Sequence, residues 1–263
     1  MKPPYEDLIE KLQQLRLNAF LTDIEELIQD DPQKAAVVLP ALERMADGEL
    51  SHRKERTVQR RIKEAMFVRD QTVDVFDFTF NASTQKLKNR YLQLLNAGPV
   101  TEAIGAVFVG NSGLGKTHLA RALGYAECQR GHRVFFATCA TMLNRLVTAE
   151  ATKNLEREVK RLEAQSLLII DELAYVTMSH QEADLFFHVI SRRHDNDRPT
   201  VVTTNKCFTE WNQVFHADGT AHAIVDRLTE KAEIFYLEGK TSYRQAHRQG
   251  LNSKKPPKRP KKH

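Results

Sequence analysis

Gly110-Asn111-Ser112-Gly113-Leu114-Gly115-Lys116-Thr117 is the stretch of sequence that decides the fold. It matches GxxxxGK[ST], a pattern in which glycines let the backbone turn tightly and approach phosphate groups without a Cβ clash. The N–H groups of such a loop and of the following helix N-terminus point at the anion. We therefore expect residues Gly110 to His118 to bind a nucleotide cofactor. In this loop Lys116 would reach the β- and γ-phosphates, and the Thr117 hydroxyl would ligate Mg²⁺.

The sequence around this loop alternates between short apolar runs and helical patterns. The loop follows the apolar run 103–110 and precedes a helix predicted over residues 116–130. Further buried strands are predicted at residues 133–138, 166–171, 200–205 and 232–238. Five short buried strands that alternate with helices predict an α/β fold with a parallel five-stranded sheet.

Polar residues follow two of these strands. Asp171 and Glu172 end the run LLIIDE, and Asn205 ends TVVTTN. Parallel sheets bind ligands at the carboxyl ends of their strands. We therefore expect Asp171 to hold Mg²⁺ and Glu172 to accept a proton from the attacking water. Asn205 alone reads as a turn residue, but after these two motifs we expect it to orient that water.

Composition places limits on the class of protein. The chain has 263 residues, of which 41% are hydrophobic, and no apolar run long enough to span a membrane. Its N-terminus lacks the apolar stretch of a signal peptide. The three cysteines form no CxxC pair, so we expect buried, inert thiols in a cytosolic protein. A signalling GTPase is disfavoured, because the sequence after Asn205 lacks the aspartate of a guanine-reading motif.

The domain organisation follows from a change of pattern. Leu8, Leu12 and Leu15 recur at helical spacing, and the segment Asp30-Asp31-Pro32 can cap the next helix. We predict a helical domain over residues 1–70, an ATPase domain over 71–250 and a disordered basic tail over 251–263. The tail carries six lysines and arginines and no acid, so the rest of the chain has a net charge of about −1.

Three basic regions are candidates for contact with duplex DNA. The first is one face of a helix predicted over residues 51–66, whose apolar stripe includes Ala65 and Met66. Its basic residues are Arg53, Arg56, Arg60 and Lys63. The second is one face of a helix within residues 150–165, formed by Lys153, Arg157 and Lys160. The third is the tail. All three would contact phosphates without reading base sequence. The competing interpretation is that these are ordinary solvated helix faces.

Taken together, the motifs resemble a known family. GNSGLGKTHLARALG, LLIIDELAY, TTNKCFTEW, IVDRL and SYR are similar to the IstB-like AAA+ ATPases, which are transposition helper proteins related to the DnaC helicase loaders. The resemblance implies an AAA+ core with a much reduced C-terminal lid after Gly239. It also implies ATP and Mg²⁺ as cofactors, an ATP-dependent homo-oligomer, an IstA-type transposase as partner, and a bacterial cytoplasm.

The same resemblance implies three further roles. Asn205 matches the sensor 1 position, and Arg227 matches the arginine finger that contacts ATP bound to a neighbouring subunit. Arg244 resembles the sensor 2 arginine, which touches ATP in its own subunit. Relatives often have Asp-Asp-Leu-Gly where this chain has Asp171-Glu172-Leu173-Ala174. Glutamate suits a general base at least as well.

We therefore predict an AAA+ ATPase that assembles on target DNA in an ATP-dependent way and delivers it to a transposase. Two alternatives stay open. A loader of a replicative helicase would prefer single strands, and an ATP-binding architectural DNA protein would not turn ATP over. A small-molecule P-loop kinase has no supporting acceptor-binding pattern in the sequence.

Overall fold

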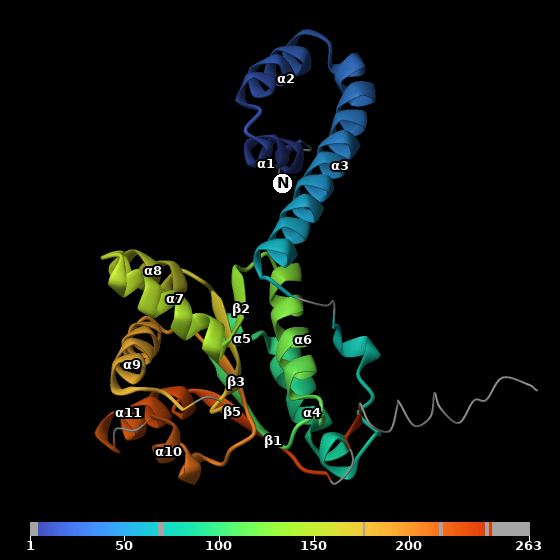
Figure 1. Cartoon of the computed structure of the whole chain (residues 1–263). Coiled ribbons are helices and arrows are strands. Elements are labelled where there is room, and N and C mark those ends of the chain that lie inside the picture. The colour runs from blue at the N-terminus through green and yellow to red at the C-terminus, as the bar shows by residue number, and fades with distance from the viewer. Residues whose placement is uncertain (1–4, 68–70, 176, 216–217, 240–241, 244–263) are drawn as a thin grey trace, which may run out of the picture. The chain divides into compact units, whose positions relative to one another are not determined.

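The computed structural model describes residues 5–67, 71–175, 177–215, 218–239 and 242–243. The chain divides into two compact units, Met1–Arg60 and Arg61–His263. Figure 1 shows the helices and strands coloured along the chain. Most of the predicted lid after Gly239, including Arg244, and the whole predicted tail lie outside the described residues.

Helices build the first unit: α1 (Glu6–Leu15), α2 (Asn18–Asp30) and the greater part of α3 (Pro32–Glu64). Leu8, Leu12 and Leu15 are buried in one apolar cluster, as their helical spacing predicts. Asp31 starts α3 as expected, since its Oδ1 accepts a hydrogen bond of 3.0 Å from the N–H of Lys34.

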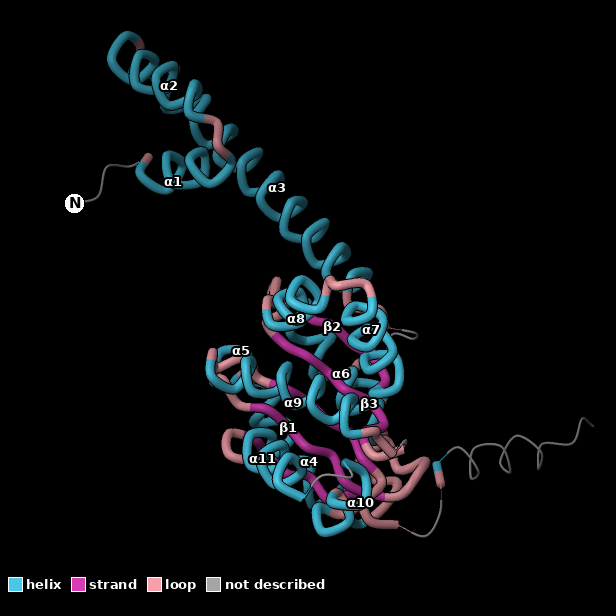
Figure 2. Tube along the Cα trace, turned by 60° about the vertical axis from the view of Figure 1, so that its left-hand side comes forward, coloured by secondary structure: helices cyan, strands magenta, loops and turns pink. Residues whose placement is uncertain are grey.

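Five parallel strands form the sheet of the second unit, which confirms the predicted α/β class. They are β1 (Gly105–Gly110), β2 (Val134–Thr138), β3 (Leu167–Leu173), β4 (Thr200–Thr204) and β5 (Ala232–Leu237). The strand order is β2-β3-β4-β1-β5, and the strands appear in magenta in Figure 2. Because all strands run the same way, the carboxyl ends of β1, β3 and β4 meet at one edge of the sheet.

Helices cover both faces of this sheet (Figure 1). Successive strand residues point to opposite faces, so Leu168 and Ile170 pack in one apolar cluster and Leu167 and Ile169 in the other. The first cluster lies against α7 (Cys139–Ala151), α8 (Leu155–Glu163), α9 (His180–Asp195), α10 (Asn212–Phe215) and α11 (Asp218–Thr229). The second lies against α4 (Ala82–Ala97) and α6 (Lys116–Gln129). Short connections are α5 (Pro99–Glu102) and the 3₁₀ turns η1 (Val73–Val75) and η2 (Phe208–Glu210).

Two expectations about single residues are wrong. Met66 does not continue the apolar stripe of α3: it follows the helix end, has φ +64° and is exposed. Cys207 is exposed, because it begins the surface turn η2 and its N–H donates to Glu210. The other two thiols, Cys128 and Cys139, are buried, and burial raises the pKa of each to about 12.

Candidate nucleotide-binding site

A glycine-rich loop joins β1 to α6 at the carboxyl edge of the sheet. Gly110 has φ +151°, and a Cβ there would collide with the backbone carbonyl of Leu237. Gly115 has φ +97° and precedes the first residue of α6, so the N-terminus of that helix opens toward the loop. Glycine is therefore required at these two positions for the loop to keep its backbone shape, because a Cβ at either would meet Leu237 or Phe76.

The two residues after the glycines point to different partners. Lys116 Nζ donates to the carbonyl of Asn111 at 2.8 Å, which places its ammonium group across the loop. Thr117 Oγ1 donates to Asp171 Oδ1 at 2.8 Å. A hydroxyl that donates its proton to a carboxylate keeps its lone pairs, so Thr117 can still coordinate a cation. The structure thus brings together the two predicted Mg²⁺ ligands, which lie 54 positions apart in the sequence.

The end of β3 is distorted where the two acids lie. Ile170 pairs with Val202 and Leu173 pairs with Thr204, so two residues of β3 oppose only Thr203 of β4. This is a β-bulge, a feature common next to active sites. Asp171 is buried, whereas Glu172 is exposed and has φ +59°. The bulge gives the two neighbouring acids different environments, which neither periodicity nor composition indicates.

A pocket of about 820 Å³ lies above these strand ends. Residues 112–118 form its floor, and Asp171, Glu172 and Asn205 line it together. Gly110 and Asn111, which were predicted to bind the cofactor, are not among the lining residues. The structure therefore brings most of the predicted cofactor-binding residues, both acids and Asn205 to one pocket. Their roles there stay predictions.

Sequence reasoning missed the opposite wall of the pocket. This wall includes Gln71, Val75, Phe76, Asp77 and Phe80, for which the sequence patterns predicted no role. Phe76 packs edge-on against His118, with ring centroids 5.1 Å apart. His118 Nε2 donates to the carbonyl of Thr72 at 2.8 Å, and burial lowers the pKa of His118. Two closely spaced aromatic residues, Phe76 and Phe80, were the available signal.

Of the two arginines implied by the resemblance, Arg227 lies among the described residues and does not line this pocket. Arg227 lies on α11, where its guanidinium packs over the ring of Phe187 at 4.8 Å. Arg244 lies outside the described residues. Tyr243, the last described residue, donates its N–H to the carbonyl of Gly113 at 3.0 Å and so contacts the loop.

The candidate DNA residues differ in their surroundings. Arg53, Arg56, Arg60 and Lys63 are all exposed along α3, as predicted. Arg53 pairs with Glu49 at 2.7 Å and donates to the carbonyl of Leu15 at 3.1 Å. The first basic stripe is therefore exposed but partly engaged in contacts within its own unit.

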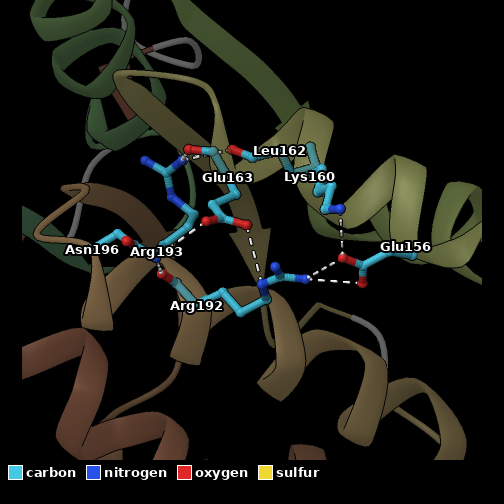
Figure 3. Close-up of polar contacts among 7 residues, drawn as sticks. All are labelled: Glu156, Lys160, Leu162, Glu163, Arg192, Arg193 and Asn196. Carbon is cyan, nitrogen blue, oxygen red and sulfur yellow. Dashed lines mark hydrogen bonds and ion pairs between the residues drawn. The ribbon is translucent and has the colours of Figure 1, made fainter.

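The second group is not one helical face. Lys153 has φ +58° and lies in the turn between α7 and α8, so only Arg157 and Lys160 belong to a helix. Lys160 pairs with Glu156 at 3.4 Å, and Glu156 also binds Arg192 of α9 at 2.9 Å (Figure 3). Part of the positive charge on α8 is thus balanced by its own acids.

The pocket residues fit a nucleotide triphosphate with Mg²⁺. The glycine loop lines the pocket at the N-terminus of α6, where backbone N–H groups can bind phosphates, and Thr117 and Asp171 offer the oxygen ligands that Mg²⁺ prefers. Among the described residues, no group of three or more His, Cys, Asp or Glu side chains forms a separate metal cage. In the same part of the chain, no helix has the length and apolarity needed to cross a bilayer.

Comparison with known proteins assigns the family. The sequence pattern of the family described as "IstB-like ATP binding protein" matches residues 10–250. A protein named for ATP binding in insertion sequence IS232, from Bacillus thuringiensis subsp. berliner, is 30% identical over 244 residues, which cover 93% of this chain and 96% of the relative. A protein named likewise for insertion sequence IS21, from Pseudomonas aeruginosa, is 31% identical over 233 residues, covering 89% and 86% of the two chains.

A solved structure agrees with the fold. The crystal structure of the DnaC helicase loader superposes with a TM-score of 0.56 at 22% identity, over 64% of this chain and 97% of that one. This likeness confirms the predicted P-loop AAA+ core. The family match over most of the sequence and the identity to the IS232 relative show that the chain belongs to the IstB-like ATP binding protein family.

Proposed function

We propose that this protein is a Mg²⁺-dependent ATPase that assembles on DNA and serves a transposase. The observation that carries the proposal is the hydrogen bond between Thr117 and Asp171 at the floor of a pocket that also contains Lys116, Glu172 and Asn205. This arrangement supplies a phosphate cradle, a metal site and a base within one cavity.

Each residue has a distinct role in hydrolysis. Lys116 and the N–H groups of the loop bind the β- and γ-phosphates. Thr117 and Asp171 hold Mg²⁺, which neutralises charge on the phosphates when it is bound. Glu172 is exposed toward the pocket and takes a proton from the water that attacks the γ-phosphate. Asn205 orients that water from the end of β4.

Self-association completes the site. Arg227 is remote from the pocket of its own subunit and would reach the nucleotide of a neighbour. A guanidinium there stabilises the charge that develops on the transferred phosphoryl group. ATP would then be bound between subunits, so nucleotide binding and assembly are coupled. Arg244, two residues after Ser242, would contact ATP in the same subunit.

DNA and a transposase are the proposed partners. Both relatives described above are named for insertion sequences, which supports a role in transposition. Exposed basic residues on α3 and α8, with Lys153 between α7 and α8, would contact duplex phosphates without base selectivity. The second candidate, a replicative helicase loader, is favoured by the likeness to DnaC, which covers 97% of that chain.

Sedimentation and hydrolysis together test the proposal. We expect the purified protein to form larger species with ATP and Mg²⁺, and Lys116→Ala to abolish this change. Duplex DNA should stimulate hydrolysis more than single-stranded DNA of equal length. Identical sedimentation of the wild type with and without ATP would contradict ATP-driven assembly. Stimulation by single strands, with capture of a replicative helicase, would favour the loader.

A further inference from the structure

One buried hydroxyl contacts both acids at the end of β3. Thr203 lies in β4 and is 1% exposed. Its Oγ1 donates to Asp171 Oδ1 at 2.6 Å and accepts from the N–H of Glu172 at 3.0 Å. A hydroxyl has a single proton, and a backbone N–H can only donate. The direction of both hydrogen bonds is therefore fixed, and one side chain connects two consecutive residues that the proposed mechanism uses for different tasks.

This hydroxyl lies where the pairing of β3 with β4 is irregular. Asp171 and Glu172 together oppose Thr203, so the regular ladder between β3 and β4 is interrupted at Glu172. Glu172 also has φ +59°, a conformation that side chains with a Cβ disfavour. The N–H of Glu172 is bound by the Thr203 side chain in place of a strand partner. Thr203 thus holds Glu172 in a conformation that its own backbone preference opposes.

Packing alone does not explain a threonine at this position. The two preceding residues of β4, Val201 and Val202, are buried valines of nearly the same shape. A valine at position 203 would fill the same volume and suit a strand equally well. What valine lacks is the hydroxyl, which in the described part of the chain bonds the Asp171 carboxylate and the backbone N–H of Glu172.

We propose that Thr203 is a positioning residue for ATP hydrolysis, which fixes the Asp171 carboxylate toward the metal site and the Glu172 side chain toward the pocket. The proposal rests on the ATPase activity proposed above. It assigns Thr203 no contact with substrate. Thr203 acts through Glu172 on the proton transfer and through Asp171 on Mg²⁺.

Removal of the hydroxyl tests this role. We expect Thr203→Val to lower kcat about 10- to 100-fold, because the Asp171 carboxylate and the backbone N–H of Glu172 each lose a hydrogen-bond partner, while KM for ATP stays within about threefold. The Mg²⁺ concentration that gives half-maximal rate should rise. Thr203→Ser keeps the hydroxyl and should retain kcat within about threefold of the wild type.

Thr200→Val is the matched control. Thr200 lies in the same strand, is nearly buried, and accepts a hydrogen bond of 3.1 Å from Arg193 Nε away from the pocket. If Thr203 only stabilised the sheet, both valine variants would lower the melting temperature and neither would change kcat selectively. Should Thr203→Val fail to fold, the pair Thr203→Ser and Thr203→Ala isolates the hydroxyl in the same way.

A double-mutant cycle identifies the residue through which Thr203 acts. In a Glu172→Gln background, measured by single-turnover hydrolysis, the additional loss of rate from Thr203→Val should shrink to about threefold or less. Fully additive losses would overturn the proposed action through Glu172. If the wild type hydrolyses ATP in a Lys116-dependent manner and Thr203→Val keeps its kcat, only this inference fails. If no Lys116-dependent hydrolysis exists, the proposed function and the inference both fail.

Discussion

Gly115→Ala perturbs the loop in two ways that the structure separates. Gly115 has φ +97°, and a Cβ there would lie 2.5 Å from Cε2 of Phe76. The left-handed backbone costs a residue with a Cβ about 1–2 kcal/mol. Forcing a methyl group against a packed ring costs about 1–3 kcal/mol more. We therefore expect Gly115→Ala to lower the free energy of unfolding of the second unit by about 2–5 kcal/mol.

The control is Gly131→Ala. Gly131 has φ +89°, but a Cβ added there would meet no atom within 4 Å, so only the backbone cost of about 1–2 kcal/mol applies. Phe76→Ala in the Gly115→Ala background should remove the clash, which would appear as a favourable coupling energy. Urea unfolding followed by the fluorescence of Trp211, the single tryptophan of the chain and buried in the second unit, measures each value. Equal losses for the two alanine variants, without coupling to Phe76, would refute the packing of that ring on the loop.

Three further predictions concern the same unit. Glu172→Gln should retain nucleotide binding but lower the hydrolysis rate about 10²- to 10⁴-fold, because an amide does not accept the proton of the attacking water. An unchanged rate in a phosphate-release assay would show that Glu172 is not the base. Burial lowers the pKa of His118 below 6.5, its value in the unfolded chain. As the pH drops, the unfolded chain therefore gains this proton before the folded one does, so the free energy of unfolding should fall below about pH 6.5. His118→Gln should lose less stability over that range in urea titrations, and equal losses would contradict this assignment. Arg193 is fully buried and donates hydrogen bonds to Thr200, Leu162, Gln165 and Pro199. Arg193→Lys should therefore lower the free energy of unfolding by about 2–4 kcal/mol in urea titrations. Arg192 is partly exposed, so Arg192→Lys should change that free energy little.

Local sequence patterns were sufficient to predict the glycine-rich loop and the strands of the sheet. The glycines and Lys116 act within one short stretch, and each strand is a compact apolar run, so their identity depends on few distant contacts. The sequence also predicted that Asp171 and Thr117 share a site, because parallel strands align their carboxyl ends. These predictions rest on chain geometry that any sequence with the same periodicity would share.

The remaining features depend on tertiary contacts. The bulge at Glu172 arises from the slipped pairing of β3 with β4, which has no counterpart in the local sequence of either strand. The packing of Phe76 on His118 joins residues 42 positions apart, through a segment with no regular periodicity. Lys153 does not lie on the predicted helical face, because the chain turns between α7 and α8. A helical wheel drawn across such a turn assigns a face that does not exist.

Titration of ATP into the protein by calorimetry, with and without Mg²⁺, tests the proposed nucleotide site most directly. We predict binding that depends on Mg²⁺, and at least about tenfold weaker binding for Lys116→Ala and for Asp171→Asn, because each loses a charged partner of the phosphates or the metal. Asp184→Asn, on α9 and outside the lining of the pocket, should bind like the wild type. Wild-type binding that is absent, or that is unchanged by both pocket variants, would contradict the assignment of this pocket to ATP and Mg²⁺.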